Sequence, residues 1–342
     1  MQMTVARSIL TGPIEGPVVW NRSDLERDDS WKMVLSGQDL EEVNVALQSV
    51  KRQNIAMGDL RRADFPLPTL GGKLTRVVEE LERGRGLKLI RGLPVDRYSE
   101  EELALVYWGI GTHLGTAVSQ NPKGDILGNV RDQGVTLSNL SARGYQTRES
   151  QGLHIDNCDV VGLLCLKTAQ SGGISQVVSS MSIYNELLRR YPWYVGVLYE
   201  PFAIDMRGQE RPGDPPVWYR TVYSYYDGKL SCGVNFTYMR SAPAKTGVPL
   251  SPIRQDALAA MEEIAYEQVF EMDFAPGDMQ FLNNYVILHD RTPYVDWDEP
   301  EKKRHLLRLW LSIPGSRKLA PDFRSAYGET LKGYEDDPRD KA

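Results

Sequence analysis

The sequence has few cysteines, and this scarcity limits what the protein can be. Its three cysteines are Cys158, Cys165 and Cys232, and no two of them form a CxxC pair. A disulfide framework or a cysteine-based zinc cluster is therefore not indicated. A small, odd count is typical of a reducing compartment, where each thiol is a small core residue. We therefore predict a cytoplasmic location.

An excess of positive charge and long apolar runs are also missing. Forty Lys and Arg residues oppose 46 Asp and Glu residues, which leaves a net charge of -6. This balance argues against broad binding of nucleic acid or anionic membranes. No apolar stretch approaches the roughly 18 residues of a membrane span, and the N-terminal residues lack the apolar run of a signal peptide. We predict a small-molecule substrate, with neither nucleic acid nor membrane as partner, and leave a homo-oligomer open.

The composition is otherwise that of an ordinary globular protein, and the first third is predicted to be rich in helix. Hydrophobic residues make up 41% of the 342 residues, enough for a large core without disulfides or a structural metal. Apolar residues recur at helical spacing in 36–53 and 70–86. A short buried strand follows from Leu87. A capping box formed by Ser99 and Glu102 then predicts a helix that runs to about Gly115.

From about residue 125 the pattern changes to short apolar runs bounded by Gly, Pro, Asn and Asp. Such runs predict the strands of a sandwich or barrel, and they lie at 160–166, 175–180, 230–236, 279–284 and 306–313. Helices are predicted to interrupt them at 181–191 and from roughly 251 to 269. The stretch 131–151 is a long loop, either a lid or plain surface loop.

A metal site is the first chemistry that the sequence suggests. His154 and Asp156 are two residues apart, so both side chains lie on the same side of an extended segment. This pair alone is weak evidence, because it occurs by chance in many proteins. A second histidine, His289, follows an apolar run and would be delivered by a separate strand. Two histidines and one carboxylate form the facial triad of non-haem Fe(II) enzymes, which leaves three coordination positions for substrate and oxygen.

The other two of the four histidines are not expected to bind the metal. His113 lies within a predicted helix, where it is expected to be a packed or capping residue. His305 lies on a predicted strand, and alternation points it away from the arginines on either side.

Arg304 and Arg308 are four residues apart on the last predicted strand, an even spacing that places both guanidinium groups on one face. Because this strand is largely apolar, the arginines are costly to bury unless they meet anions. A dicarboxylate co-substrate would supply the anion, held by a bidentate fork. The alternative is a pair of surface arginines on an amphipathic edge strand.

Four blocks together show a resemblance to a known family. The blocks GLHID, SGGISQVVSS, PGDMQFLNNYVILHDRT and RHLLRLWLS resemble, in this order, the TauD/TfdA (taurine dioxygenase) family, which includes clavaminate-synthase-like enzymes. The family consists of Fe(II)- and 2-oxoglutarate-dependent oxygenases. The resemblance implies a mainly β fold with flanking helices and a double-stranded β-helix, or jelly-roll, core over residues 85–320. Residues 1–84 would form a helix-rich extension packed on the core, and 321–342 a polar C-terminal tail.

The resemblance also implies roles for individual residues. His154, Asp156 and His289 match the iron ligands. Arg304 matches the arginine that pairs with the distal carboxylate of 2-oxoglutarate, and Ser175 matches the hydroxyl residue that shares this carboxylate. Arg308 matches an arginine that binds the acidic group of the substrate or lines the same pocket. The DWDEPEKK insertion lengthens the gap before Arg304, so the division of roles between the two arginines is left open.

The reaction implied is oxidation of an unactivated C–H bond by hydroxylation, desaturation or cyclisation, with Fe(II), 2-oxoglutarate and O2 and with release of succinate and CO2. The carboxylate of Asp156 favours these outcomes, because related halogenases lack it. Arg308 and Arg220 suggest a small carboxylate-bearing substrate. The candidate substrate-binding residues are Arg308, Asn129, Arg131, Arg220 and Asn284.

Two alternatives from other classes are a metal-dependent hydrolase on a cupin-like barrel and a non-catalytic jelly-roll binding protein. The hydrolase would have no use for Arg304 and Ser175. The binding protein would have no need of three metal ligands.

Overall fold

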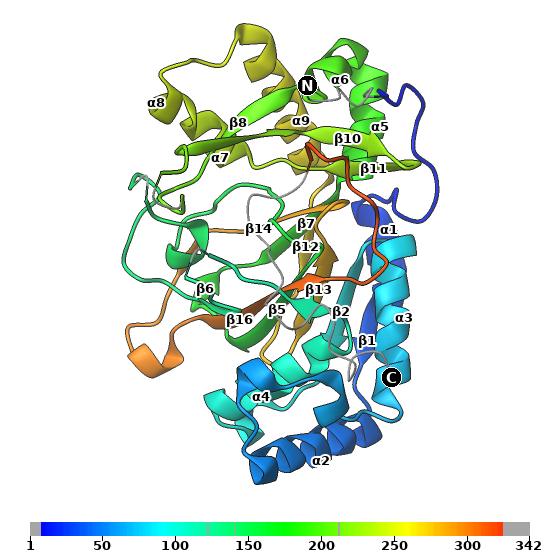
Figure 1. The fold of residues 1–342 in the computed structure, drawn as a ribbon, viewed down its shortest axis with the longest axis vertical. Helices are drawn as coiled ribbons and strands as arrows, with labels where there is room; N and C mark the ends of the chain where they lie inside the picture. The colour runs from blue at the N-terminus through cyan, green and yellow to red at the C-terminus, as the bar shows by residue number, and fades with distance from the viewer. Residues whose placement is uncertain (1–7, 122, 140, 211–212, 324–342) are drawn as a thin grey trace.

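The computed structural model describes residues 8–121, 123–139, 141–210 and 213–323, and a seven-stranded sheet is its framework (Figure 1). Only the pair β1 and β2 is parallel, and the other neighbours are antiparallel. The order is β1 (Lys32–Val34), β2 (Leu87–Arg91), β13 (Met279–Asn283), β5 (Val160–Lys167), β16 (His305–Ser312) and β3 (Thr116–Ala117), with β4 (Leu127–Val130) also paired to β16.

The last strand, β16, shows why this sheet has two different faces. Side chains of a strand alternate between its faces. Leu307, Leu309 and Leu311 point into the core beneath the N-terminal helices. Arg308 and Trp310 point to the opposite face, where both contact Asp156. One strand therefore contributes both to the packing of the helices and to a polar site.

Helices from the first third of the chain cover the outer face of the sheet (Figure 1). Ser36 forms a capping box at the start of α2 (Gly37–Gln53), and Ser99 forms one with Glu102 at the start of α4 (Glu100–Thr112). Between them, α3 (Leu70–Arg83) ends at the cap residue Gly84. The side chains of these helices and of the sheet form one apolar cluster, so the N-terminal residues share a core with the strands.

A three-stranded antiparallel sheet faces the inner side of the large one. It consists of β12 (Phe270–Met272), β7 (Ser175–Ser179) and β14 (Ile287–Arg291), with β7 in the centre. The two sheets meet where the Ser175 hydroxyl donates a hydrogen bond of 2.6 Å to Gln280 Oε1 on β13. On its far side, this sheet packs against α5 (Ser180–Arg190) and α9 (Pro252–Gln268). The described strands thus form two facing sheets rather than one closed ring.

Smaller elements complete the fold around the second sheet. Two antiparallel hairpins, β8–β9 and β10–β11, lie near α5 and α9 (Figure 1). The remaining elements with regular helix or strand structure are α1 (Arg22–Arg27), β6 (Ser171–Gly172), α6 (Pro192–Leu198), β8 (Pro201–Asp205), β9 (Val217–Thr221), β10 (Tyr223–Tyr226), β11 (Lys229–Cys232), α7 (Phe236–Ser241), α8 (Pro243–Thr246) and β15 (Tyr294–Val295). None of the helices described is long and apolar enough to span a membrane.

Most of the predicted helices and strands are confirmed. One predicted strand changes into a helix before its end. The run 230–236 is a strand only as far as Cys232. Asn235 caps a helix that begins at Phe236, because its side chain accepts a hydrogen bond from the backbone N–H of Tyr238. The helix that Ser99 opens ends at Thr112, with His113 as its C-terminal cap residue.

The predicted C-terminal tail falls mostly on residues 324–342, which lie outside the described residues. Just before them, the side chain of Phe323 is completely buried in the core beside Tyr285. The core therefore extends to residue 323.

The turn before β13 provides a test of the fold. Gly277 has a φ of +87°, and a Cβ atom there would lie 2.0 Å from the Leu93 carbonyl oxygen. Gly315 also has a positive φ, of +73°, but a Cβ atom would meet nothing within 4 Å. We expect Gly315→Ala to cost about 1–2 kcal/mol of unfolding free energy through backbone strain alone. Gly277→Ala should cost roughly 1–3 kcal/mol more because of the clash. Urea denaturation measures both, and equal losses would contradict the turn geometry.

Candidate active site

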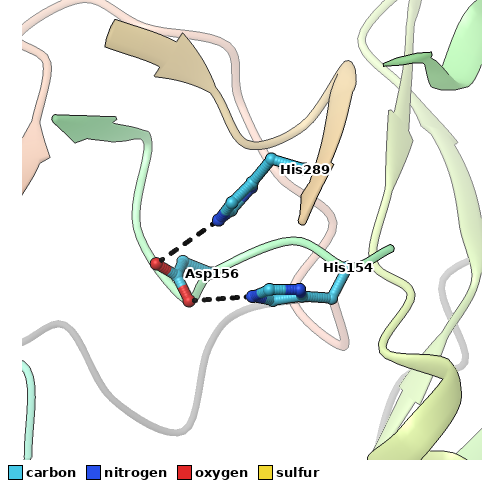
Figure 2. Close-up of side chains that lie close together, drawn as sticks. All are labelled: His154, Asp156 and His289. Atoms are coloured by element: carbon cyan, nitrogen blue, oxygen red, sulfur yellow. Dashed lines mark ion pairs between the residues drawn. The ribbon is translucent and has the colours of Figure 1, made fainter. Parts of the chain in front are cut away.

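Three buried side chains, His154, Asp156 and His289, converge on one point (Figure 2). The Nε2 atom of His154 lies 3.8 Å from Asp156 Oδ1, and the Nε2 atom of His289 lies 3.9 Å from Asp156 Oδ2. One potential ligand atom from each residue lies within 4.8 Å of the other two. Two imidazoles and one carboxylate in this arrangement can take one face of an Fe(II) ion.

A pair of backbone hydrogen bonds brings the two histidines together. The N–H of His154 donates to the carbonyl of His289 at 3.0 Å, and the N–H of His289 donates to the carbonyl of His154 at 2.9 Å. On the other side of the segment, the N–H of Ile155 donates to the carbonyl of Val234. The segment is therefore extended, and the odd-numbered Ile155 faces away from its neighbours His154 and Asp156.

Burial and neighbouring groups shift the pKa values of Asp156 and His289. Burial raises the pKa of the Asp156 carboxyl, but the neighbouring Arg308 and the two histidines outweigh this effect and lower the pKa to about 2. Burial, together with the neighbouring His154, lowers the pKa of His289 to about 3. At neutral pH the carboxylate is ionised and His289 is neutral. These are the protonation states that metal coordination requires.

Neighbouring groups fix the orientation of the ligands. Trp310 Nε1 donates a hydrogen bond of 2.8 Å to Asp156 Oδ2, and the side-chain oxygen of Asn284 accepts from the Asp156 backbone N–H at 3.1 Å. Nδ1 of His154 lies 2.9 Å from the carbonyl oxygen of Gly152. This contact requires a proton on Nδ1 and leaves Nε2 as the metal-binding atom. Asn284, a predicted substrate residue, thus holds the backbone of Asp156 in place.

A pocket next to the triad contains Arg304 and Ser175 together with all three potential ligands. Its lining residues are Val130, Gly144, Tyr145, Gln151, His154, Asp156, Leu163, Ser175, Phe274, His289, Asp290, Arg291, Arg304, Leu306 and Arg308. The Arg304 side chain is buried, and burial lowers its pKa to about 10. Its Nη1 atom has no hydrogen-bond partner among the described residues. Arg304 lies directly before β16, whose first residue is His305, and it lines this pocket together with Arg308.

Arg308 differs from Arg304, because its guanidinium group already has partners. Nε donates to Gln120 Oε1 at 2.8 Å, and Nη1 lies 3.4 Å from Asp156 Oδ2. The group also packs between the rings of Tyr145 and Trp310, at 5.0 and 4.8 Å from their centroids. Arg308 therefore compensates the charge of Asp156.

A second pocket adjoins the first and shares five lining residues with it, Gly144, Tyr145, Gln151, Asp156 and Arg308. It contains Arg220, one of the predicted substrate residues. Its lining residues are Arg143, Gly144, Tyr145, Gln151, Ile155, Asp156, Asn157, Ile204, Asp205, Met206, Gln209, Trp218, Arg220, Gly233, Val234, Asn235, Tyr238, Arg308 and Trp310. The predicted loop 131–151 contributes Arg143, Gly144, Tyr145 and Gln151, so it forms part of the walls.

Two other predicted substrate residues lie elsewhere. Asn129 is exposed, and its side chain is 2.8 Å from Nε2 of His305, on the outer face of β16. Arg131 is also exposed, and neither residue lines either pocket.

Sequence reasoning missed Trp310 and Gln120. Trp310 could have been found, because it lies two residues after Arg308 on the same face of the strand. Gln120 could not, because no periodic pattern surrounds it.

The fold and the site together define a metal-dependent oxygenase with two facing β-sheets, and comparisons with known proteins identify its family. The model of the taurine catabolism dioxygenase TauD, TfdA family matches residues 53–310. FR-33289 synthase of Streptomyces rubellomurinus is 37% identical over 317 residues, which cover 91% of this chain and 94% of that protein. The taurine hydroxylase-like protein SAT17 of Stachybotrys chartarum is 30% identical over 90% of this chain and 84% of its own length.

Solved structures share the fold at low sequence identity. A structure of asparagine oxygenase with Fe(II), a hydroxyasparagine and succinate aligns with a TM-score of 0.66 and 17% identity, over 82% of this chain and 93% of that one. A structure of the oxygenase OrfP with Fe and alpha-ketoglutaric acid aligns with a TM-score of 0.62 and 15% identity. The alignment covers 84% of this chain and 99% of that one.

The chain belongs to the taurine catabolism dioxygenase TauD, TfdA family. It is therefore a dioxygenase, and the predictions of the fold class and of Fe(II) and 2-oxoglutarate as cofactor and co-substrate are confirmed.

Two adjacent buried asparagines provide a test of the support around the ligands. Asn284 bonds the Asp156 backbone, whereas the side chain of Asn283 donates to the Leu81 carbonyl beneath α3. Asn284→Ala and Asn283→Ala should each cost about 1–3 kcal/mol of stability, because each leaves buried polar groups unpaired. Only Asn284→Ala should weaken metal binding, by roughly 10-fold or more. Calorimetric titration with Mn(II) measures the difference, and equal metal affinities would exclude this role.

Proposed function

We propose that His154, Asp156 and His289 hold Fe(II), and that Arg304 and Ser175 bind the distal carboxylate of 2-oxoglutarate. The reaction is then oxidation of an unactivated C–H bond in a small carboxylate-bearing molecule, most simply hydroxylation, with release of succinate and CO2. The unpaired Arg304 guanidinium group, in the same pocket as the triad, is the observation that carries this proposal.

The environment of Arg304 favours a dicarboxylate. No ion pair to its guanidinium group occurs in the described residues, although the group is buried and packs 5.1 Å from the ring centroid of Tyr294. A buried cation is costly unless an anion pairs with it. A dicarboxylate can place one end on Arg304 and its other end at the three ligands. The Ser175 hydroxyl lies in the same pocket and can reorient to share the carboxylate.

When bound, iron and 2-oxoglutarate supply the oxidising chemistry, and the protein supplies position and shielding. Asp156 stays ionised because it pairs with Arg308. The hydrogen bond from Trp310 fixes the orientation of its carboxylate. All three ligands are buried, which keeps bulk water away from the reacting groups.

The two alternative classes leave part of this site without a purpose. A hydrolase needs a metal-bound water but no buried arginine for a second carboxylate. A non-catalytic binding protein needs no convergent ligands with metal-ready protonation states.

A small carboxylate-bearing substrate agrees with the solved relatives, which contain derivatives of asparagine or arginine. The three cysteines are free and buried, which supports the prediction of a cytoplasmic location.

Loss of a metal ligand should abolish turnover without loss of the fold. His154→Ala, Asp156→Ala and His289→Ala should each reduce iron-dependent succinate release to background, because a facial triad has no spare ligand. His113→Ala is the matched control, since this histidine caps α4 and contacts the Phe65 carbonyl. Succinate release and circular dichroism are measured together. Near-normal turnover in any ligand variant would remove that residue from the site.

Substitutions of Arg304 and Arg308 should have different effects on 2-oxoglutarate binding. Arg304→Ala should weaken 2-oxoglutarate binding by about 2–5 kcal/mol, which is roughly 30-fold or more, because a buried carboxylate loses its partner. Arg304→Lys should restore part of the affinity, and Ser175→Ala should have a milder effect. Arg308→Ala should affect 2-oxoglutarate less.

Each variant is titrated anaerobically with 2-oxoglutarate at fixed Fe(II), and the metal-to-ligand absorption band gives the dissociation constant of 2-oxoglutarate. If Arg308→Ala weakens 2-oxoglutarate binding more than Arg304→Ala does, Arg308 is the arginine that binds the distal carboxylate. No effect of either would place the anchor elsewhere.

A further inference from the structure

We propose that the second pocket binds the primary substrate through a carboxylate group, and that Arg220 is the anchor for this group. The inference rests on the proposed function, because it takes Asp156, which lines both pockets, as a metal ligand.

Arg220 is a buried cation without an anionic partner. It lies on β9 with 2% of its surface exposed. Its guanidinium group packs 4.1 Å from the ring centroid of Phe323, and Nη1 donates to the Asn157 side-chain oxygen at 3.3 Å. Nε has no partner, and no carboxylate lies within ion-pair distance among the residues that the structure describes. Burial lowers its pKa to about 10, so the group is still charged at neutral pH.

The other charged groups of the pocket do not compensate Arg220. Asp205 accepts hydrogen bonds from the Arg207 backbone N–H at 2.8 Å and from the Ser241 hydroxyl at 2.9 Å. Asp156 is paired with Arg308. Arg143 adds a further positive charge to the wall. The pocket therefore has an excess of positive charge, which an anionic ligand would balance.

Arg220 and Arg304 lie in different pockets. Arg304 lines the pocket that contains all three ligands, and Arg220 lines only the other one. In the proposed function, 2-oxoglutarate would pair one carboxylate with Arg304 and direct its other end to the three potential ligands, which leaves Arg220 for a different anion. Because Arg308 pairs with Asp156, Arg220 is the better anchor for the substrate, although the sequence resemblance points to Arg308.

The wall of the pocket indicates the class of substrate. Apolar side chains, among them Ile204, Trp218 and Val234, lie beside the amides of Asn157 and Asn235. This combination suits a small molecule with a carboxylate at one end and an apolar body. With the carboxylate on Arg220, the body extends toward Asp156, which lines both pockets.

The test uses propionate as the probe and propionamide, its neutral counterpart, as the control ligand. The intact protein is loaded with Mn(II) and saturated with 2-oxoglutarate, and the relaxation of the probe protons by Mn(II) reports binding near the metal. We expect saturable relaxation for propionate and none for propionamide. Arg220→Gln should weaken propionate by roughly 30-fold or more, and Arg220→Lys by less, because the ammonium keeps the charge.

Arg317→Gln is the matched control variant. Arg317 also has an unpartnered Nε and packs 5.6 Å from the ring centroid of Tyr285, but it lines neither pocket. It should leave propionate binding unchanged. The affinity for Mn(II) is measured for every variant, because Arg220 also contacts Asn157, next to Asp156. The proposal requires Mn(II) affinity within about threefold of wild type, below the 10-fold loss typical of groups that orient metal ligands.

Three results would overturn the proposal. The first is the absence of propionate binding to the wild type, and the second is equal propionate affinity in Arg220→Gln. The third is a joint loss of Mn(II) and propionate, which would make Arg220 a positioning residue for the metal loop. Failure of the proposed function is recognised separately, because 2-oxoglutarate would then give no absorption band with Fe(II) in the wild type, whatever propionate does.

Discussion

The site depends on one pair of backbone hydrogen bonds, between His154 and His289. These bonds fix the segment before β5 against β14, so that residues 135 positions apart in the chain present their imidazoles to the same point. The distances from each Nε2 to the Asp156 carboxylate, 3.8 and 3.9 Å, follow from this register. A shift of one residue would turn one histidine to the other face and remove it from the site.

The second constraint is the charge buried around this point. Asp156 is held ionised by Arg308 and oriented by Trp310, both from the inner face of β16. Arg304, directly before β16, and Arg220, on β9, have no anionic partner among the described residues. Unpaired buried cations are unfavourable in a site built for packing alone. The proposed binding of 2-oxoglutarate at Arg304 and of a substrate carboxylate at Arg220 would give each cation an anionic partner.

The arrangement also explains how one strand serves both stability and chemistry. The leucines of β16 join the apolar core under α2, α3 and α4, and this packing fixes the strand. The alternate positions then hold Arg308 and Trp310 in place against Asp156. Because the helical extension shares this core, changes in the N-terminal helices are expected to reach the metal centre through β16 rather than through direct contact.

The sequence by itself determined the elements with a regular period and the residues that share one segment. Helical spacing predicted α2 and α3, and the two-residue and four-residue intervals predicted that His154 joins Asp156 and that Arg304 joins Arg308. The tertiary structure decided which partners these groups have. Arg308 pairs with Asp156, Asn284 supports the ligand loop and Asn129 lies on the outer face, because such contacts come from distant segments. Local periodicity gives the face of a strand, but only the packing of the two sheets determines what that face meets.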